Sequence, residues 1–250
     1  MRALRTIAVI PARLASTRFP GKVLADLYGR PILAHVIERA RQIAGVDAIF
    51  VATDDEGIAE AARKEGAEAR MTRSDHPSGS DRIGEVVRGL DPLPDFVLNL
   101  QGDEPLLPSA DVSRMVQAMS ASPDAIWTLA HRIEDPDELA RASVVKVVTG
   151  AGGRALYFSR AAIPYPRLPS SCAALRHVGV YGYPRALLEA MLALAPSPLE
   201  QCEGLEQLRA LEAGIPIRVQ LSERGSPGID LPEDLERLKR EYPTPESLAP

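Results

Sequence analysis

Short apolar runs alternate with amphipathic segments in the first half of this chain, and this alternation constrains the fold more than any other feature. Thr6 to Pro11 is a β-branched apolar run typical of a buried strand, and apolar residues recur at helical spacing from Ile32 onward. The later segments keep the same order: Ala48 to Ala52, Asp55 to Lys64, Glu68 to Met71, Asp81 to Arg88, Phe96 to Leu100 and Ala110 to Met119. This rhythm predicts βαβ units around a mostly parallel sheet.

The second half adds a different strand pattern before it returns to α/β order. The runs Val144 to Thr149 and Ala155 to Ser159 flank a glycine-rich turn, which is typical of an antiparallel hairpin. The remaining expected elements are the strands Ile126 to Arg132, His177 to Tyr183 and Ile215 to Leu221, and the helices Arg185 to Leu194, Leu199 to Ala213 and Asp234 to Tyr242. We therefore predict an α/β fold with a mostly parallel central sheet, helices on both faces and a smaller antiparallel lobe.

Composition limits the number of domains and the kinds of partner. With 250 residues, 45% of them hydrophobic, the chain can bury one large core, so we expect a single domain over residues 1–250. A net charge of −5 with interspersed signs argues against a nucleic-acid surface. The two cysteines, Cys172 and Cys202, show no metal-site spacing, and no apolar run is long enough for a membrane helix. A cytoplasmic protein is expected.

The loop that follows the first strand combines cations with small and hydroxylated residues. Within Ile10 to Lys22, the side chains of Arg13, Arg18 and Lys22 can neutralise phosphate charge, and the small residues let backbone N–H groups approach phosphate oxygens. The spacing is that of neither a Walker loop nor G-x-G-x-x-G. A basic surface loop is the alternative, but a position behind a buried strand favours a polyphosphate site.

Two acidic segments are candidates for a metal site. Asp103 and Glu104 follow the strand Phe96 to Leu100 at the ligand-facing end of a parallel sheet, where a capped turn is the competing interpretation. Asp230 lies just before the last predicted helix, whereas Glu233 and Asp234 fit its N-terminal dipole and are interpreted as structural. Magnesium prefers such hard oxygen donors beside a bound triphosphate.

Further polar residues could bind a base or a polar substrate. The segment Arg73 to Arg82 is too dense in hydrogen-bonding groups for a core, and could contact a base edge or lie on the surface. His177 and Tyr181 are four apart on a strand and therefore share one face, whereas Arg160 lies beyond a separate strand. Glu206 and Gln207 lie about 100° apart on a helix, so both would have to flank one pocket to share a ligand.

Taken together, six motifs closely resemble the 3-deoxy-manno-octulosonate (Kdo) cytidylyltransferase family over nearly the whole chain. The motifs are P-A-R-x-A-S-T-R-x-P-G-K, Q-G-D-E-P, Y-F-S-R-A-x-I-P, H-x-G-x-Y-G-Y, the Leu205 to Arg209 segment and G-x-D-x-P-E-D-L. The resemblance implies a nucleotide-diphospho-sugar transferase fold, a homodimer with an element around residues 126–183, and a requirement for Mg²⁺. It also implies transfer of CMP from CTP to the anomeric hydroxyl of Kdo for lipopolysaccharide synthesis, with pyrophosphate released.

The resemblance also assigns roles by position. Arg13, Ser16, Thr17 and Lys22 would hold the triphosphate, and Arg73, Ser78 and Ser80 would help to select the cytidine. Asp103 and Asp230 would bind magnesium, and these two acids with Arg13 and Lys22 would form the catalytic set. The sugar acid would contact Gln101, Arg160, His177, Tyr181, Glu206 and Gln207.

One departure and two alternatives accompany this assignment. Between Pro166 and His177 the chain is shorter than the usual family pattern, so contacts from that loop do not carry over. The triphosphate half of the motifs says little about the acceptor, so another sugar acid, such as 8-amino-Kdo or a sialic acid, is the first alternative. A non-catalytic nucleotide-binding protein on the same fold is the second, and the presence of both Asp103 and Asp230 argues against it.

Overall fold

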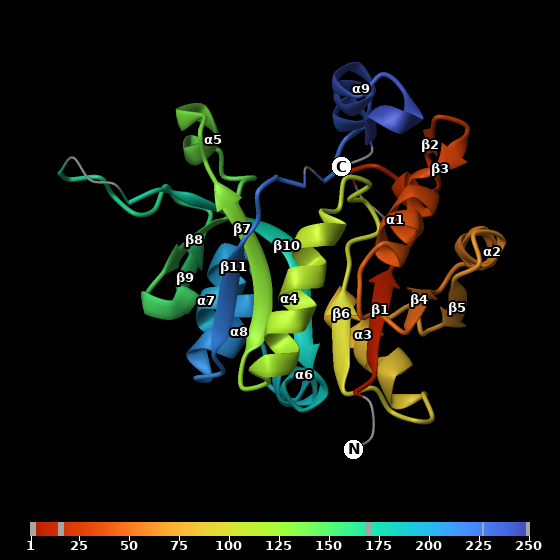
Figure 1. The fold of residues 1–250 in the computed structure, drawn as a ribbon, viewed down its shortest axis with the longest axis horizontal. Coiled ribbons are helices and arrows are strands. Elements are labelled where there is room, and N and C mark those ends of the chain that lie inside the picture. Colours follow the sequence, from red (N-terminus) through yellow and green to blue (C-terminus); the bar gives the residue numbers. More distant parts are fainter. Residues whose placement is uncertain (1–3, 15–17, 169–171, 227, 249–250) are drawn as a thin grey trace. The chain divides into compact units, whose positions relative to one another are not determined.

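The computed structural model describes residues 4–14, 18–168, 172–226 and 228–248, which form two compact units. The first unit comprises Met1–Ser113 and Ser226–Pro250, and the second comprises Arg114–Gly225. Ser16 and Thr17, two residues of the predicted phosphate loop, lie outside the described residues. Figure 1 labels the helices and strands of both units.

The first unit contains a four-stranded parallel sheet in the order β6-β1-β4-β5. Its strands are β1 Thr6–Pro11, β4 Ala48–Thr53, β5 Glu68–Met71 and β6 Phe96–Asn99. Strand β1 lies between β4 and β6 (Figure 1), and its residues from Ile7 to Ile10 are completely buried. The predicted βαβ order is confirmed here, because apolar strands buried on both faces need helices to cover them.

Helices also belong to this unit, and two of them begin at a side-chain cap. They are α1 Ile32–Arg41, α2 Glu56–Lys64, α3 Gly79–Arg88 and α9 Pro232–Glu241. Asp55 accepts the backbone N–H of Ile58 at the start of α2, and Ser78 accepts that of Asp81 at the start of α3. The short segments η1 Lys22–Leu24, β2 Asp26–Leu27, β3 Arg30–Pro31 and η3 Pro245–Leu248 complete this unit, and α4 Ser109–Ala121 leads out of it.

The second unit contains the predicted antiparallel lobe. Strand β10 Leu175–Pro184 pairs antiparallel with β7 Ile126–Arg132 and with β8 Lys146–Thr149, and β8 pairs antiparallel with β9 Ala155–Ser159 across η2 Ala151–Gly153. Strand β11 Ile217–Leu221 lies parallel to β7. The register of β10 on β7 shifts between Val178 and Tyr181, so this central strand carries a bulge.

The single helix predicted from Leu199 to Ala213 is wrong. The structure has α7 Pro198–Glu203 and α8 Gln207–Glu212, with Gly204 between them in the left-handed conformation at φ 64°. The apolar period continues across the break, and this continuity concealed a C-cap glycine. The helix α5 Pro136–Ala140 was not predicted, whereas α6 Arg185–Leu192 was.

Within the described ranges, no helix has both the length and the apolar character needed to cross a membrane.

Candidate active site

A cavity of about 380 Å³ lies where β1 ends in the first unit. Its walls come from four segments that are distant in the sequence, namely residues 11–13, 18–23, 76–82 and 101–103. Arg13, Arg18, Lys22 and Arg82 are among the lining residues, so positive charge dominates the described wall. A cationic cavity at the carboxyl end of parallel strands is suited to an anionic ligand.

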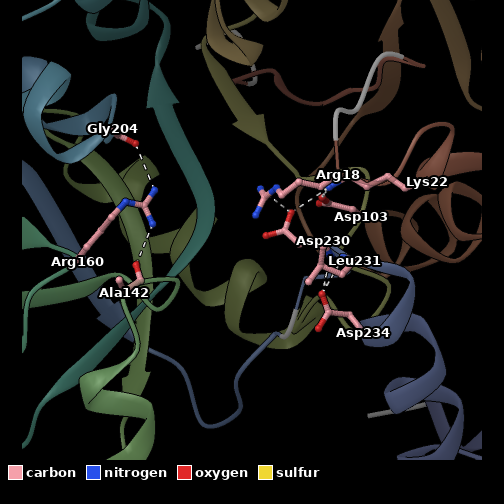
Figure 2. Close-up of polar contacts among 9 residues, drawn as sticks. All are labelled: Arg18, Lys22, Asp103, Ala142, Arg160, Gly204, Asp230, Leu231 and Asp234. Atoms are coloured by element: carbon pink, nitrogen blue, oxygen red, sulfur yellow. Dashed lines mark hydrogen bonds and ion pairs between the residues drawn. The ribbon is translucent and has the colours of Figure 1, made fainter.

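Lys22 joins the two acidic segments at one edge of this cavity. Its ammonium group forms an ion pair with Asp103 and a second one with Asp230, whose Oδ1 lies 3.3 Å from Nζ. The guanidinium of Arg18 reaches the same Asp230 oxygen at 3.2 Å (Figure 2). Asp103 and Asp230 are far apart in the sequence, yet the structure brings both carboxylates to one cation.

Backbone and capping bonds keep the two acidic segments together. The N–H of Ile229 donates to the carbonyl of Asp103 at 3.0 Å, which ties the segment before α9 to the turn after β6. Asp234 accepts the N–H groups of Asp230 and Leu231 at 3.0 and 2.9 Å (Figure 2). The interpretation of Asp234 as structural is confirmed, and the Asp230 carboxylate is directed toward the cations.

These two carboxylates are compatible with a magnesium ion that arrives with a nucleotide. Among the described residues there is no group of three or more His, Cys, Asp or Glu side chains able to hold a metal by themselves. Magnesium needs fewer, because it is commonly bound by one or two carboxylates together with substrate phosphates and water. Asp103 and Asp230 already share a cation, the Lys22 ammonium, so their placement also suits a metal ion that replaces it.

The start of α3 forms another part of the cavity wall. Ser78 lines the cavity and caps the helix: its hydroxyl accepts the N–H of Asp81 at 3.1 Å and donates to the Asp81 carboxylate at 2.7 Å. A helix N-terminus favours an anion by its unpaired N–H groups and dipole. Of the other two predicted cytidine residues, Arg73 is exposed and pairs with Asp75, and Ser80 is buried within α3.

Sequence reasoning missed two lining residues in the same segment. His76 is buried and bonds to the carboxylate of Glu85, and Arg82 is buried and pairs with Asp54 at 3.3 Å. The His76 bond lowers the pKa of Glu85, although burial of that carboxyl opposes the shift. Because Glu85 also accepts the N–H of Arg73, it holds the 73–76 loop against α3. Only the polar density of this segment indicated these residues.

In the second unit, the structure brings His177 and Tyr181 together, as their shared strand face predicted. Their ring centroids are 5.3 Å apart, and Phe158 packs edge-on against His177 at 5.1 Å. Burial raises the pKa of the Tyr181 hydroxyl, and the nearby Tyr183 and Glu206 add to the shift. Tyr181 is therefore protonated at neutral pH and presents a hydroxyl donor.

The neutral His177 ring is held in one tautomer. Thr128 Oγ1 lies 2.7 Å from the carbonyl of Val180 and 3.0 Å from His177 Nε2. Because the hydroxyl has one proton and donates it to the carbonyl, we assign the Nε2 proton to His177 as donor to Thr128. Nδ1 is then left as an acceptor. Burial lowers the pKa of His177 to about 3, so this assignment holds at neutral pH.

His177 makes the stability of the chain depend on pH. The pKa of His177 is about 3 in the folded chain, against an ordinary value of 6.5 that applies to the unfolded chain. As the pH falls, the unfolded chain therefore binds this proton first. The stabilisation is complete above pH 6.5 and is lost progressively below it, at about 1.4 kcal/mol per pH unit. When the pH falls from 6.5 to 5, we expect the free energy of unfolding of His177→Gln to fall by about 2 kcal/mol less than that of wild type. Urea unfolding at the two pH values measures this difference. Parallel pH profiles would contradict this assignment.

The other predicted sugar-acid residues are divided between the units. Gln101 lines the cavity of the first unit and bonds to Asn99 at 3.3 Å. Arg160, Glu206 and Gln207 belong to the second unit, as do His177 and Tyr181. The Arg160 guanidinium donates to the carbonyls of Glu203, Ala142 and Gly204, and Figure 2 shows the latter two bonds.

Comparison with known proteins places this geometry in a family. The cytidylyltransferase family model matches residues 7–220. A 3-deoxy-manno-octulosonate cytidylyltransferase from Anaeromyxobacter sp. is 50% identical over 236 residues, which cover 94% of this chain and 96% of the relative. Another from Thermodesulfovibrio yellowstonii is 47% identical, over 92% of this chain and 95% of the relative. This chain belongs to the 3-deoxy-manno-octulosonate cytidylyltransferase family. It is a nucleotidyltransferase enzyme.

Solved structures agree with this membership. A CMP:2-keto-3-deoxy-manno-octonic acid synthetase complexed with CTP is 44% identical and superposes with a TM-score of 0.90, over 95% of this chain and 98% of that one. The 4-diphosphocytidyl-2C-methyl-D-erythritol synthase from Anaerococcus prevotii is 14% identical with a TM-score of 0.65, over 96% and 99% of the two chains. That second likeness shows a shared fold only, and the predicted nucleotidyltransferase fold is confirmed.

Proposed function

We propose that this enzyme transfers CMP from CTP to the anomeric hydroxyl of Kdo, giving CMP-Kdo and pyrophosphate for lipopolysaccharide synthesis. One observation carries the proposal: this chain has a cationic cavity with Lys22, Asp103 and Asp230 clustered at its edge. The chain is also 44% identical to a CMP-Kdo synthetase whose structure contains CTP. The cluster suits a nucleoside triphosphate, because Lys22 can bind phosphate oxygens and the two carboxylates can bind a cation beside them.

In this proposal the first unit binds CTP. Arg13 and Lys22, with Ser16 and Thr17 of the same loop, hold the triphosphate, and the cationic wall supports that role. Arg73, Ser78 and Ser80 select the cytidine. Ser78 is the best supported of the three, because it alone of them lines the cavity.

Mg²⁺ is the proposed cofactor, held by Asp103 and Asp230. When bound, it neutralises phosphate charge and increases the acidity of the attacking hydroxyl. The ion pairs to Lys22 support this placement, because the same two carboxylates already face one cation. Lys22 contacts both acids and lines the cavity, so it can move from the carboxylates to the phosphates when CTP binds.

The second unit contributes most of the sugar-acid contacts. A neutral His177 offers an acceptor at Nδ1 and Tyr181 offers a donor, which suits hydroxyl groups of the sugar. Arg160, Glu206 and Gln207 are the other proposed contacts in this unit, and Gln101 is the proposed contact in the first unit.

The chemical step is a direct displacement at the α-phosphorus. The anomeric oxygen forms the new P–O bond, its proton passes to solvent, and the bond to pyrophosphate breaks, so that pyrophosphate leaves. Arg13 and Lys22 stabilise the negative charge that develops on the phosphates, and positioning supplies much of the remaining rate. Direct displacement requires no nucleophilic side chain, because no covalent enzyme intermediate forms.

We also propose a homodimer in the cytoplasm. The segment between β9 and β10 exposes Tyr165 and Leu168 at 84% and 72%, and β9 exposes Leu156 at 61%. Large apolar side chains that are this exposed are available for another subunit to cover. Neither Cys172 nor Cys202 is in a disulfide, which suits a reducing compartment. Sedimentation equilibrium measures the subunit number directly, and a monomer at micromolar concentration would refute the dimer.

The assay that tests the function follows pyrophosphate release from CTP with a panel of sugar acids, with and without Mg²⁺. We expect turnover with Kdo to exceed that with 8-amino-Kdo or a sialic acid, and to disappear when Mg²⁺ is removed by a chelator. Preference for another acid would change the substrate assignment. CTP binding without turnover on any acid would refute the proposed reaction.

A further inference from the structure

One carboxylate, that of Glu203 at the end of α7, joins two separate parts of the second unit. Its Oε1 accepts the hydroxyl of Ser159 at 2.5 Å, and its Oε2 accepts the N–H of Arg160 at 2.9 Å. Both oxygens are therefore used by consecutive residues at the end of β9. The bonds from Arg160 and Ser159 lower the pKa of Glu203, so the carboxylate stays ionised and these bonds are charge-assisted.

Arg160 is held from three directions. Beyond the bond to its N–H, its carbonyl accepts the ammonium of the buried Lys146 at 2.5 Å. Its side chain returns to the same helix end, because Nε donates to the backbone carbonyl of Glu203 at 2.8 Å. With the Ala142 and Gly204 carbonyls at 3.1 and 3.5 Å, the guanidinium is fixed by main-chain groups (Figure 2).

The other side of Glu203 leads directly into the turn that carries two more predicted sugar-acid residues. Gly204 ends α7 at φ 64°, Leu205 is buried, and Glu206 and Gln207 then begin α8. A second pair locks the two helices, because Arg209 donates to both oxygens of Glu200 at 2.8 and 2.6 Å. The turn is thus anchored to β9 through Glu203 and to α7 through Glu200.

We propose that Glu203 is a positioning residue for the sugar acid: it holds Arg160, the residue after β9, and the 204–207 turn in a fixed relation. This inference rests on the proposed function. Glu203 has both carboxylate oxygens bonded within the protein, so its role is to keep three substrate contacts aligned before binding. Side chains that are aligned in advance lower the cost of binding substrate and transition state alike.

A uniform loss of binding affects KM more than kcat. We therefore expect Glu203→Ala to raise the KM for Kdo about tenfold, as the loss of charge-assisted bonds implies, with kcat within about twofold. The KM for CTP should not change, because none of the described residues between 142 and 207 lines the cavity of the first unit. Glu203→Gln keeps an oxygen for the Arg160 N–H and should raise the KM for Kdo only about threefold.

The experiment measures both KM values and kcat for wild type, both Glu203 variants and the control Glu189→Ala, with thermal unfolding of each. Glu189 is an exposed residue on α6 that pairs with Arg185, so its loss should leave both KM values unchanged. Equal rises in the KM for CTP and Kdo, or an unchanged KM for Kdo in Glu203→Ala, would overturn the proposal. If that variant does not fold, an unchanged KM for Kdo in Glu203→Gln overturns it. Wild-type enzyme inactive on Kdo would refute the proposed function and this inference together.

Discussion

An Asp103→Asn variant is expected to lose about a thousandfold in kcat at saturating CTP, Kdo and Mg²⁺, which corresponds to about 4 kcal/mol of transition-state stabilisation. The amide keeps the size and shape of the side chain, and the carbonyl of residue 103 can still accept the N–H of Ile229. The charge is lost, however, so Asp230 alone faces the cation site and the Lys22 ammonium loses one of its two acidic partners. Turnover near that of wild type at saturating Mg²⁺ would contradict the metal-ligand role.

Asp234→Asn is the matched control for this change. Asp234 belongs to the same acidic cluster, but its carboxylate accepts backbone N–H groups and pairs with Arg237, and an amide oxygen can still accept those N–H bonds. Its kcat should stay within about twofold of wild type, because the amide still accepts the capping bonds and the carboxylates of Asp103 and Asp230 are unchanged. The loss of charge at the cap should lower the free energy of unfolding by at most about 1 kcal/mol. Binding of Mn²⁺ in the presence of CTP provides a second readout, which should weaken in Asp103→Asn and not in the control.

A Lys146→Met variant is expected to lower the free energy of unfolding by about 3 kcal/mol. Lys146 is completely buried, and its ammonium donates to the carbonyls of Arg141, Val144 and Arg160 at 3.0, 2.7 and 2.5 Å. Methionine fills a similar volume but removes this donor from the carbonyls of Val144 and Arg160, and each unsatisfied buried acceptor costs about 1–3 kcal/mol. The Arg141 carbonyl still accepts the N–H of Val144 at 3.1 Å. Part of that cost is returned, because the variant no longer buries a charge; this burial also lowers the pKa of Lys146.

Chemical unfolding by guanidinium chloride, at pH 7 and under reducing conditions, tests this expectation. The control is Lys239→Met on α9, where the side chain pairs with Glu236 near the surface and its loss should change stability by less than about 0.5 kcal/mol. Equal midpoints for wild type and Lys146→Met would show that the three carbonyls find other partners. An intact KM for CTP in the folded fraction is expected, since none of these residues lines the cavity of the first unit.

The sequence predicted much of this architecture through local patterns. Apolar runs such as Thr6 to Pro11 identify strands, and the two-residue period of a strand placed His177 and Tyr181 on one face. The same kind of pattern failed at Gly204, where an apolar period that continues on both sides concealed a left-handed residue and two short helices. Lys146 was missed because a lysine between valines in a strand is typical of an exposed face, whereas here three carbonyls converge on it.

The sequence by itself determined most of the strand and helix order, the phosphate-type loop and, by resemblance, the family, because each of these depends on residues close together in the chain. Only the tertiary structure decided that Lys22 forms ion pairs with both Asp103 and Asp230. The same holds for Glu203, whose carboxylate accepts hydrogen bonds at the end of β9. The physical reason is that ion pairs and buried hydrogen bonds act over a few ångströms, so the folded backbone, and not spacing along the chain, selects the partners.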